Sequence, residues 1–248
     1  SFLRTHPITS ERISDIEDRI KDFPYKQRMD NPSFHFVKGK IRVFLQDRRL
    51  VKKELEANIK NKTYVSELGE RYALAYAYLL NDDFDGAQRQ LKWLFDKDIE
   101  NPMIEQLNIE YLIKKGDTKL AYEAIKKALK KYPNYRAFVY ELANYLIQTN
   151  SVNDAIKFLQ NYLIAFNKDS ELYKLLAKAY SIKGNQLLQY ESLSQSNYYK
   201  YNLQEAIIQM DMAVRARDGN FYEKSRVEAR LKQLQREKEL FEISKANL

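Results

Sequence analysis

Apolar residues recur along most of the chain at the three- and four-residue spacing of amphipathic helices, and these helices come in pairs. Residues 102–135 form the clearest pair: a helix, a tight turn at Gly116-Asp117, a second helix, and a stop at Pro133. This unit is 34 residues long, and the same frame recurs on both sides of it. The pattern predicts an all-α fold built from repeated helical hairpins.

Columns of small and large apolar residues carry the 34-residue step. Small residues at fixed positions let two helices approach closely, and large ones between them fill the seam. An ordinary helical bundle predicts a 3.6-residue periodicity but no 34-residue register, so a stack of hairpins is the better interpretation. The columns are Ala87, Ala121 and Ala155; Ala75, Ile109, Ala143 and Ala177; Leu91, Ile125 and Leu159; and Tyr78, Leu112, Leu146 and Tyr180.

Both ends of the chain depart from this repeat. Near the N-terminus we expect a helix with Ser10 as its N-cap, ending near Phe23-Pro24 and followed by a polar linker. A degenerate first hairpin follows, at Ser33–Gln46 and Arg49–Lys60. At the other end, Phe221–Glu242 is highly charged, as a capping helix that faces water should be.

The frame also slips once within the array. Ala206 and Ala213 fit the alanine columns only if a repeat starts at Leu187, half a period early. The helix at about Leu187–Lys200 must then complete one hairpin and also begin the next, with Leu203–Arg217 as its partner. We expect the array to bend or close at this point and to form a pocket there.

Composition and charge narrow the class of protein. The net charge of +8 is spread along the helices, so we interpret it as promoting solubility. Lys126, Lys127, Lys130 and Lys131 lie on a second helix without interleaved aromatic residues, so nucleic-acid binding is not predicted. The sequence has no Cys, and no apolar run approaches the length of about 20 residues that a membrane span needs.

Candidate catalytic chemistry is sparse. The two histidines, His6 and His35, lie far apart in the sequence, and the zinc-binding motif HExxH is absent. The six glycines are scattered and form no phosphate-binding loop, and we identify no nucleophile–base pair. The sequence therefore predicts that this chain is not an enzyme by itself.

The repeat columns resemble the tetratricopeptide repeat (TPR) family, whose units carry a small residue, an aromatic residue or Leu, a turn Gly, two Ala and a Pro in this order. Gly116, Ala121 and Pro133 stand at the family's places, whereas Ile109 stands where a small residue is usual. In the next unit Asn167 replaces the Pro. The resemblance covers about residues 33–217 and implies a TPR-type helical-hairpin solenoid.

Three parts follow from this interpretation. A non-repeat segment occupies residues 1–32, an array of about four to five hairpins occupies 33–217, and a charged capping helix occupies 218–248.

In TPR proteins the first helix of each pair lines a concave face that binds protein or peptide partners. Asn144, Lys174 and Lys178 resemble half of the clamp with which some family members grip a C-terminal carboxylate, but Gln106 and Glu110 replace the other half. A solvated face without a fixed ligand is the alternative, and Tyr198 may simply be a packing residue of the displaced pair. The resemblance maps the concave face to Tyr72, Tyr76, Gln106, Glu110, Tyr140, Asn144, Lys174, Lys178, Glu191 and Tyr198.

The N-terminal motif Thr5-His6-Pro7, followed by Arg12-Ile13, is similar to the stretch just after the catalytic core of HExxH zinc metalloproteases. Together with the TPR array it resembles the C-terminal part of BepA-type periplasmic metalloproteases. Residues 1–32 would then be the tail of a protease domain that this chain lacks, plus a linker.

This resemblance implies a periplasmic module for outer-membrane protein assembly and for degradation of misassembled proteins. Its partners would be the assembly machinery or an unfolded β-barrel substrate. In such a protein His6 would cap the zinc of the intact enzyme, while this chain alone would hold no cofactor. A role of His6 in a tight turn, and a free-standing TPR scaffold without a protease, remain alternatives. A self-sufficient metallopeptidase is disfavoured because its ligands are missing.

Overall fold

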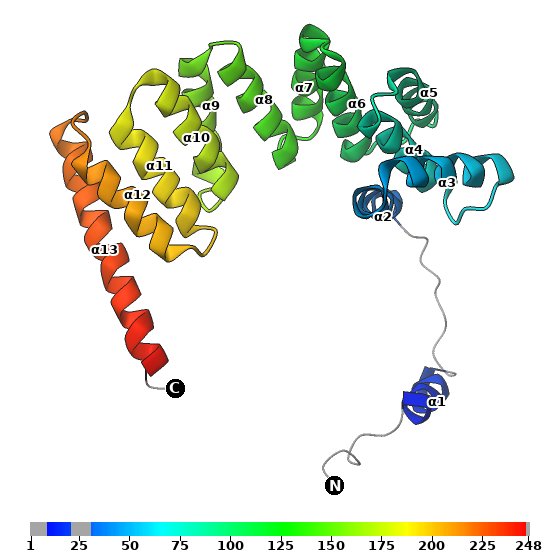
Figure 1. Ribbon diagram of the computed structural model, residues 1–248, viewed down its shortest axis with the longest axis horizontal. Coiled ribbons are helices and arrows are strands. Elements are labelled where there is room, and N and C mark those ends of the chain that lie inside the picture. The colour runs from blue at the N-terminus through cyan, green and yellow to red at the C-terminus, as the bar shows by residue number, and fades with distance from the viewer. Residues whose placement is uncertain (1–8, 21–30, 247–248) are drawn as a thin grey trace. The chain divides into compact units, whose positions relative to one another are not determined.

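In a computed structural model, residues 9–20 and 31–246 are described, and in these ranges every regular element is an α-helix. The chain divides into two compact units, residues 1–73 and 74–248 (Figure 1). The helices are α1 (Thr9–Ile20), α2 (Pro32–Leu45), α3 (Arg48–Asn61), α4 (Glu67–Leu80), α5 (Phe84–Phe95), α6 (Pro102–Lys115), α7 (Thr118–Lys131), α8 (Arg136–Gln148), α9 (Val152–Ala165), α10 (Ser170–Lys183), α11 (Gln186–Tyr198), α12 (Leu203–Arg215) and α13 (Phe221–Ala246).

The helix boundaries agree with the sequence prediction to within a few residues, with two differences. Helix α1 begins at Thr9, so Ser10 lies within its first turn and not at the N-cap. Helix α13 reaches Ala246, whereas the sequence predicted an end at Glu242. The expected end of the first helix near Phe23-Pro24 lies outside the described residues, as does the Thr5-His6-Pro7 motif.

In the first unit, two glycines let α2 and α4 come into close contact. A Cβ added at Gly69 would lie 2.6 Å from the His35 Cβ, and one added at Gly39 would lie 2.9 Å from the Ala73 Cβ. Arg42 joins α2 to its neighbours, because it forms ion pairs with Glu54 at 2.7 Å and Glu70 at 3.1 Å. The degenerate first hairpin is therefore a packed element.

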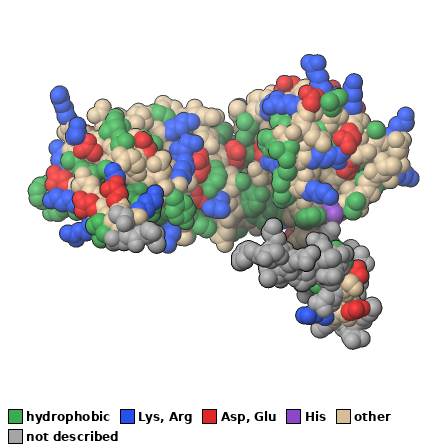
Figure 2. Space-filling view, turned by 60° about the horizontal axis from the view of Figure 1, so that its bottom comes forward, with side chains coloured by type: hydrophobic (Ala, Val, Ile, Leu, Met, Phe, Trp, Pro, Cys, Tyr) green, Lys and Arg blue, Asp and Glu red, His purple; other side chains and the backbone are tan. Residues whose placement is uncertain are grey.

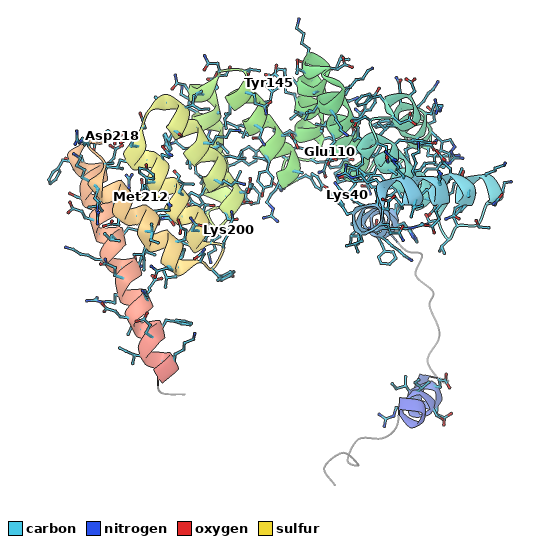
Figure 3. All side chains as sticks on the ribbon, viewed as in Figure 1. Lys40, Glu110, Tyr145, Lys200, Met212 and Asp218 are labelled. Carbon is cyan, nitrogen blue, oxygen red and sulfur yellow. The ribbon has the colours of Figure 1, made fainter. Side chains whose placement is uncertain are left out.

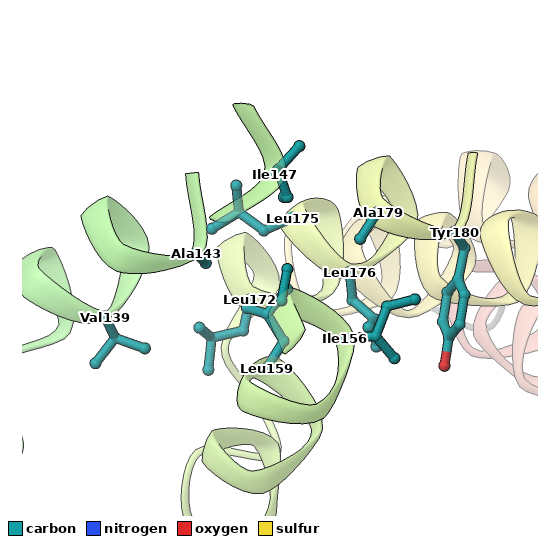
Figure 4. Packing of buried hydrophobic residues seen from close by; sticks show 11 residues of the cluster. Val139, Ala143, Ile147, Ile156, Leu159, Leu172, Leu175, Leu176, Ala179 and Tyr180 are labelled. Carbon is teal, nitrogen blue, oxygen red and sulfur yellow. The ribbon is translucent and has the colours of Figure 1, made fainter. Parts of the chain in front are cut away.

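In the second unit, hairpins stack through apolar seams, of which the seam between α8, α9 and α10 is the most extensive (Figure 4). Ala143 and Ala155 are fully buried and allow the helices to approach, while Leu159 and Leu172 fill the space between them. These residues belong to the columns read from the sequence or lie beside them. The seam therefore explains why the 34-residue register exists.

The turns inside the hairpins confirm the register at the level of the backbone. Each contains a residue in the left-handed region, where glycine and asparagine are best tolerated. The spacing is 34 residues for the first four turns and 17 residues for the last. These left-handed residues are Asp82, Gly116, Asn150, Gly184 and Tyr201.

The last of these turns shows that α11 both completes one hairpin and begins the next. Three buried serines on α11 leave room for neighbours on both of its sides. The Ser196 hydroxyl donates to the Ser170 carbonyl before α10, and the Ser194 hydroxyl donates to the Ala206 carbonyl of α12, at 2.8 and 2.7 Å. The half-period slip is therefore built by small polar residues that let α11 pack closely against both α10 and α12.

Helix α13 closes the array. Its buried residues Val227 and Leu234 pack onto the core formed by α11 and α12. Arg226 holds Glu191 through two hydrogen bonds of 2.8 and 2.7 Å, and Asp218 accepts the Leu187 N–H at 3.0 Å. With 26 residues, α13 is about 39 Å long, so it runs back along the 13-residue α12 and continues past that helix (Figure 1).

Candidate functional site

The structure distributes the expected concave-face residues among quite different environments. Tyr72 and Tyr76 are 1% and 5% exposed, so α4 places them in the interior and not on an open surface. The Tyr72 ring stacks on Phe36 of α2, with ring centroids 4.7 Å apart. Lys174 and Lys178 are exposed on α10, as expected.

The next residues of the expected face are half-buried and bonded to one another. The Gln106 amide donates to Glu110 at 3.0 Å and accepts from the Tyr135 hydroxyl at 3.1 Å. Asn144 is half-buried on α8. Glu191 is occupied by Arg226 of the capping helix, so its charge is compensated. Much of this surface is therefore already engaged within the protein.

Tyr140 belongs to a network centred on Asp169, a carboxylate that is only 7% exposed. The Tyr140 hydroxyl donates to Asp169 at 2.6 Å, and Arg136 donates to the same oxygen at 3.1 Å. The other oxygen accepts the backbone N–H groups of Glu171 and Leu172 at 3.0 and 3.3 Å and so caps α10.

This network shifts the ionisation of both partners. Burial alone would raise the pKa of Asp169, but the hydrogen bonds from Tyr140 and from the Leu172 N–H outweigh it and hold the pKa below its ordinary value. Burial and then the bond to Asp169 raise the pKa of Tyr140, so its hydroxyl remains a donor. Asp169 is thus a charged acceptor shared by α8 and α10.

A hollow of about 810 Å³ lies at the displaced helix pair, between the α11–α12 connection and the far half of α13. Figure 3 shows Lys200 at this end of α12 and Asp218 at the opposite end. We call this cavity the aromatic hollow. Its lining residues are Lys168, Tyr198, Tyr199, Tyr201, Leu203, Arg230, Glu237 and Phe241.

Aromatic contacts fix the walls of the aromatic hollow. The Tyr198 and Tyr199 rings meet edge to face, with centroids 5.4 Å apart, and Tyr173 stacks on Tyr199 at 5.6 Å. The Arg230 guanidinium lies over the Tyr198 ring, 4.6 Å from its centroid, and 3.8 Å from Glu237. The hollow thus combines rigid apolar walls with both signs of charge.

Tyr201 is the most unusual residue of the aromatic hollow. Its φ of 60° is a conformation that costs a non-glycine residue about 1–2 kcal/mol, and its side chain is 98% exposed. The equivalent turns of the regular repeats use Asp82, Gly116, Asn150 and Gly184, which tolerate this conformation better. A bulky ring displayed there contributes little to the core, so its role lies at the surface.

A second hollow of about 520 Å³ adjoins the Asp169 network and shares Lys168 with the aromatic hollow. Tyr135, Arg136 and Tyr140 also line it. Lys168 is exposed and lies in the short α9–α10 connection. The two hollows therefore meet at one basic residue, and Tyr140 and Tyr198 of the expected face line one hollow each.

Other features of the described residues place no catalytic centre beside these hollows. Within residues 9–20 and 31–246, no group of three or more acidic or histidine side chains is arranged to hold a metal ion. No helix of these ranges has the length and the apolar character needed to cross a membrane. On the face shown in Figure 2, Lys and Arg side chains are dispersed among acidic and apolar ones.

Sequence reasoning identified Tyr198 but missed the contributions of Tyr201, Leu203 and Phe241. The signal was available in the half-period slip, which moves a hairpin turn to residue 201 and so places an aromatic residue where a turn residue is expected. The contribution of Phe241 depends on the path of α13, which periodicity alone does not give.

Comparisons with known proteins agree with this fold. A family model described as tetratricopeptide repeat matches residues 112–179, whereas no curated protein matches the chain. A tetratricopeptide repeat protein from Parabacteroides merdae has 14% identity and a TM-score of 0.50, with 84% of this chain and 88% of that chain covered.

Two further structures are similar to the chain. YrrB, described as a TPR protein with an unusual peptide-binding site, has 12% identity and a TM-score of 0.48, over 81% of this chain and 97% of its own. MamA from Desulfovibrio magneticus RS-1 has 20% identity and a TM-score of 0.47, over 67% of this chain and 94% of its own. Residues 112–179 thus carry tetratricopeptide repeats, within a chain whose fold is an all-α, TPR-type solenoid of helical hairpins.

Proposed function

We propose that the chain is a non-catalytic protein-binding module that holds an extended segment of its partner in the aromatic hollow. The observation that carries this proposal is Tyr201, a fully displayed ring kept in an unfavourable backbone conformation at the mouth of a preformed cavity. Tyrosine rings bury a large contact area at little cost in side-chain entropy, which suits a binding surface.

The charges around the aromatic hollow define the segment that fits. An apolar or aromatic side chain of the partner would contact Tyr199, Leu203 and Phe241. An acidic group next to it would face Lys168, which carries no ion pair among the described residues. Because Lys168 also lines the second hollow, the segment would continue toward Tyr140 and the face predicted from the sequence.

Replacing Tyr201 by glycine tests the proposal. Glycine relieves the left-handed strain, so we expect the free energy of unfolding to change by less than about 1 kcal/mol. The lost ring should weaken binding about tenfold. Peptides selected from a phage-displayed random library on the wild-type protein provide the probe, and fluorescence anisotropy of the labelled peptides gives Kd.

Tyr222→Ala is the matched control, because it removes an 81% exposed tyrosine ring at the opposite end of α13. It should leave Kd unchanged. Equal losses for the two variants, or a failure of the library to yield any binder, would contradict a site in the aromatic hollow. Tyr140 is less suitable for this test because its loss would also disturb Asp169.

We further propose that this module serves a BepA-type periplasmic metalloprotease, with outer-membrane assembly machinery or an unfolded β-barrel as its partner. The support is the order of features along the sequence, from Thr5-His6-Pro7 through a capped helix to the array. His6 would then cap the zinc of the intact enzyme. A free-standing scaffold fits the fold equally well. An HExxH motif and a signal peptide encoded upstream of Ser1 would support the protease, whereas a native start codon directly before Ser1 would exclude it.

A further inference from the structure

The outer face of α2 carries an exposed apolar stripe. Phe34, Val37 and Ile41 follow one another at helical spacing and are 55%, 46% and 51% exposed. The opposite face of α2 holds the fully buried Phe36 and Val43. Helix α2 therefore has two apolar faces, of which only one is covered by the described packing of the first unit.

Helix α1 has a face that matches this stripe. Ile13 and Ile16 are both at least half exposed and have the three-residue spacing of Phe34 and Val37. Apolar residues at alternating three- and four-residue spacing on two helices interlock in a lengthwise seam. Neither α1 nor the outer face of α2 would bury its apolar side chains without such a partner.

Charge favours this pairing over a pairing of two α2 helices. Helix α1 contains four acidic and two basic residues, whereas α2 contains three basic residues and no acidic one. Two copies of α2 placed face to face would bring Lys38 against its own copy, and like charges repel. The acidic α1 would instead place Glu17 beside Lys38.

The length of chain between the helices also permits the contact. Ten residues, 21–30, separate α1 from Asn31, and they can span up to about 35 Å, which exceeds the roughly 21 Å length of the 14-residue α2. We propose that α1 docks antiparallel onto the outer stripe of α2, so that Ile16 contacts Val37 and Ile41 while Glu17 pairs with Lys38. This inference does not depend on the proposed partner-binding site.

Disulfide trapping tests the docking, because the chain has no cysteine of its own. Glu17→Cys with Lys38→Cys should form an intramolecular disulfide in dilute monomer under oxidised glutathione, as judged by non-reducing mass spectrometry. Glu17→Cys with Ala57→Cys is the control, since Ala57 is exposed on α3, and it should oxidise about fivefold more slowly.

Two further substitutions separate docking from chance encounter. Ile16→Glu in the Glu17/Lys38 pair should slow oxidation about fivefold, to the rate of the control pair, while Ser14→Glu should not slow it. All these positions are exposed, so circular dichroism should show unchanged helicity. Equal rates for the two cysteine pairs, insensitivity to Ile16→Glu, or a disulfide that forms only between molecules would overturn the proposal.

Discussion

Leu159→Ala is expected to lower the free energy of unfolding by about 2–5 kcal/mol. Leu159 is fully buried on α9 and fills the seam between α8 and α10 together with Leu172 (Figure 4). Removing its isobutyl group loses the transfer free energy of the side chain and leaves a cavity. Urea unfolding monitored by circular dichroism at neutral pH measures the change.

Ile164→Ala is the matched control on the same helix. Ile164 is 81% exposed, so its truncation should change the free energy of unfolding by no more than about 0.5 kcal/mol. Similar effects for the two variants would show that α9 is not held by the seam. Because each hairpin contacts mainly its neighbours, the loss should concentrate in α8–α10 and be visible there as faster hydrogen exchange.

Asp169→Ala is expected to lower the free energy of unfolding by about 2–3 kcal/mol. The substitution removes the N-cap of α10 and leaves the Tyr140 hydroxyl and Arg136 without their shared acceptor. Asp169→Asn should lose less, since its amide oxygen can still cap the helix. Equal losses for Ala and Asn would assign the effect to charge and not to capping.

Acid should remove the advantage of the wild type over Asp169→Asn. The folded-state pKa of Asp169 is lowered, so its stabilisation is fully present above the unfolded value near 4 and is lost as the pH falls through the folded value. Urea unfolding at a series of pH values between 7 and 3 should show the difference shrinking toward the acid end. A difference that grows toward acid would contradict the lowered pKa.

The sequence predicted the fold class, the hairpin register and the half-period slip, because all three rest on local periodicity. Ala206 occupies the alanine column displaced by 17 residues, and Tyr201 forms the corresponding turn in the structure. Serines on α11 were not read as packing residues, since buried serines have no periodic apolar signal. Their role follows from hydrogen bonds to Ser170 and Ala206, which are distant in the sequence.

The candidate site was predicted only in part. Family positions placed Tyr140, Glu191 and Tyr198 on a binding face, but those positions specify a direction from the helix axis and not what lies opposite. Tyr140 meets Asp169, 29 residues away, and Glu191 meets Arg226, 35 residues away. Such pairings depend on how helices are placed relative to one another.

For this protein, the sequence by itself determined the helices, their 34-residue repetition and the point at which the frame slips. These properties follow from spacing within short segments, where helical geometry fixes which residues share a face. The tertiary structure alone decided that α13 extends beyond α12, that Tyr201 is displayed beside Phe241, and that Asp169 is buried. Cavities and buried charges arise where separate helices meet, and their energies depend on distances that no local pattern specifies.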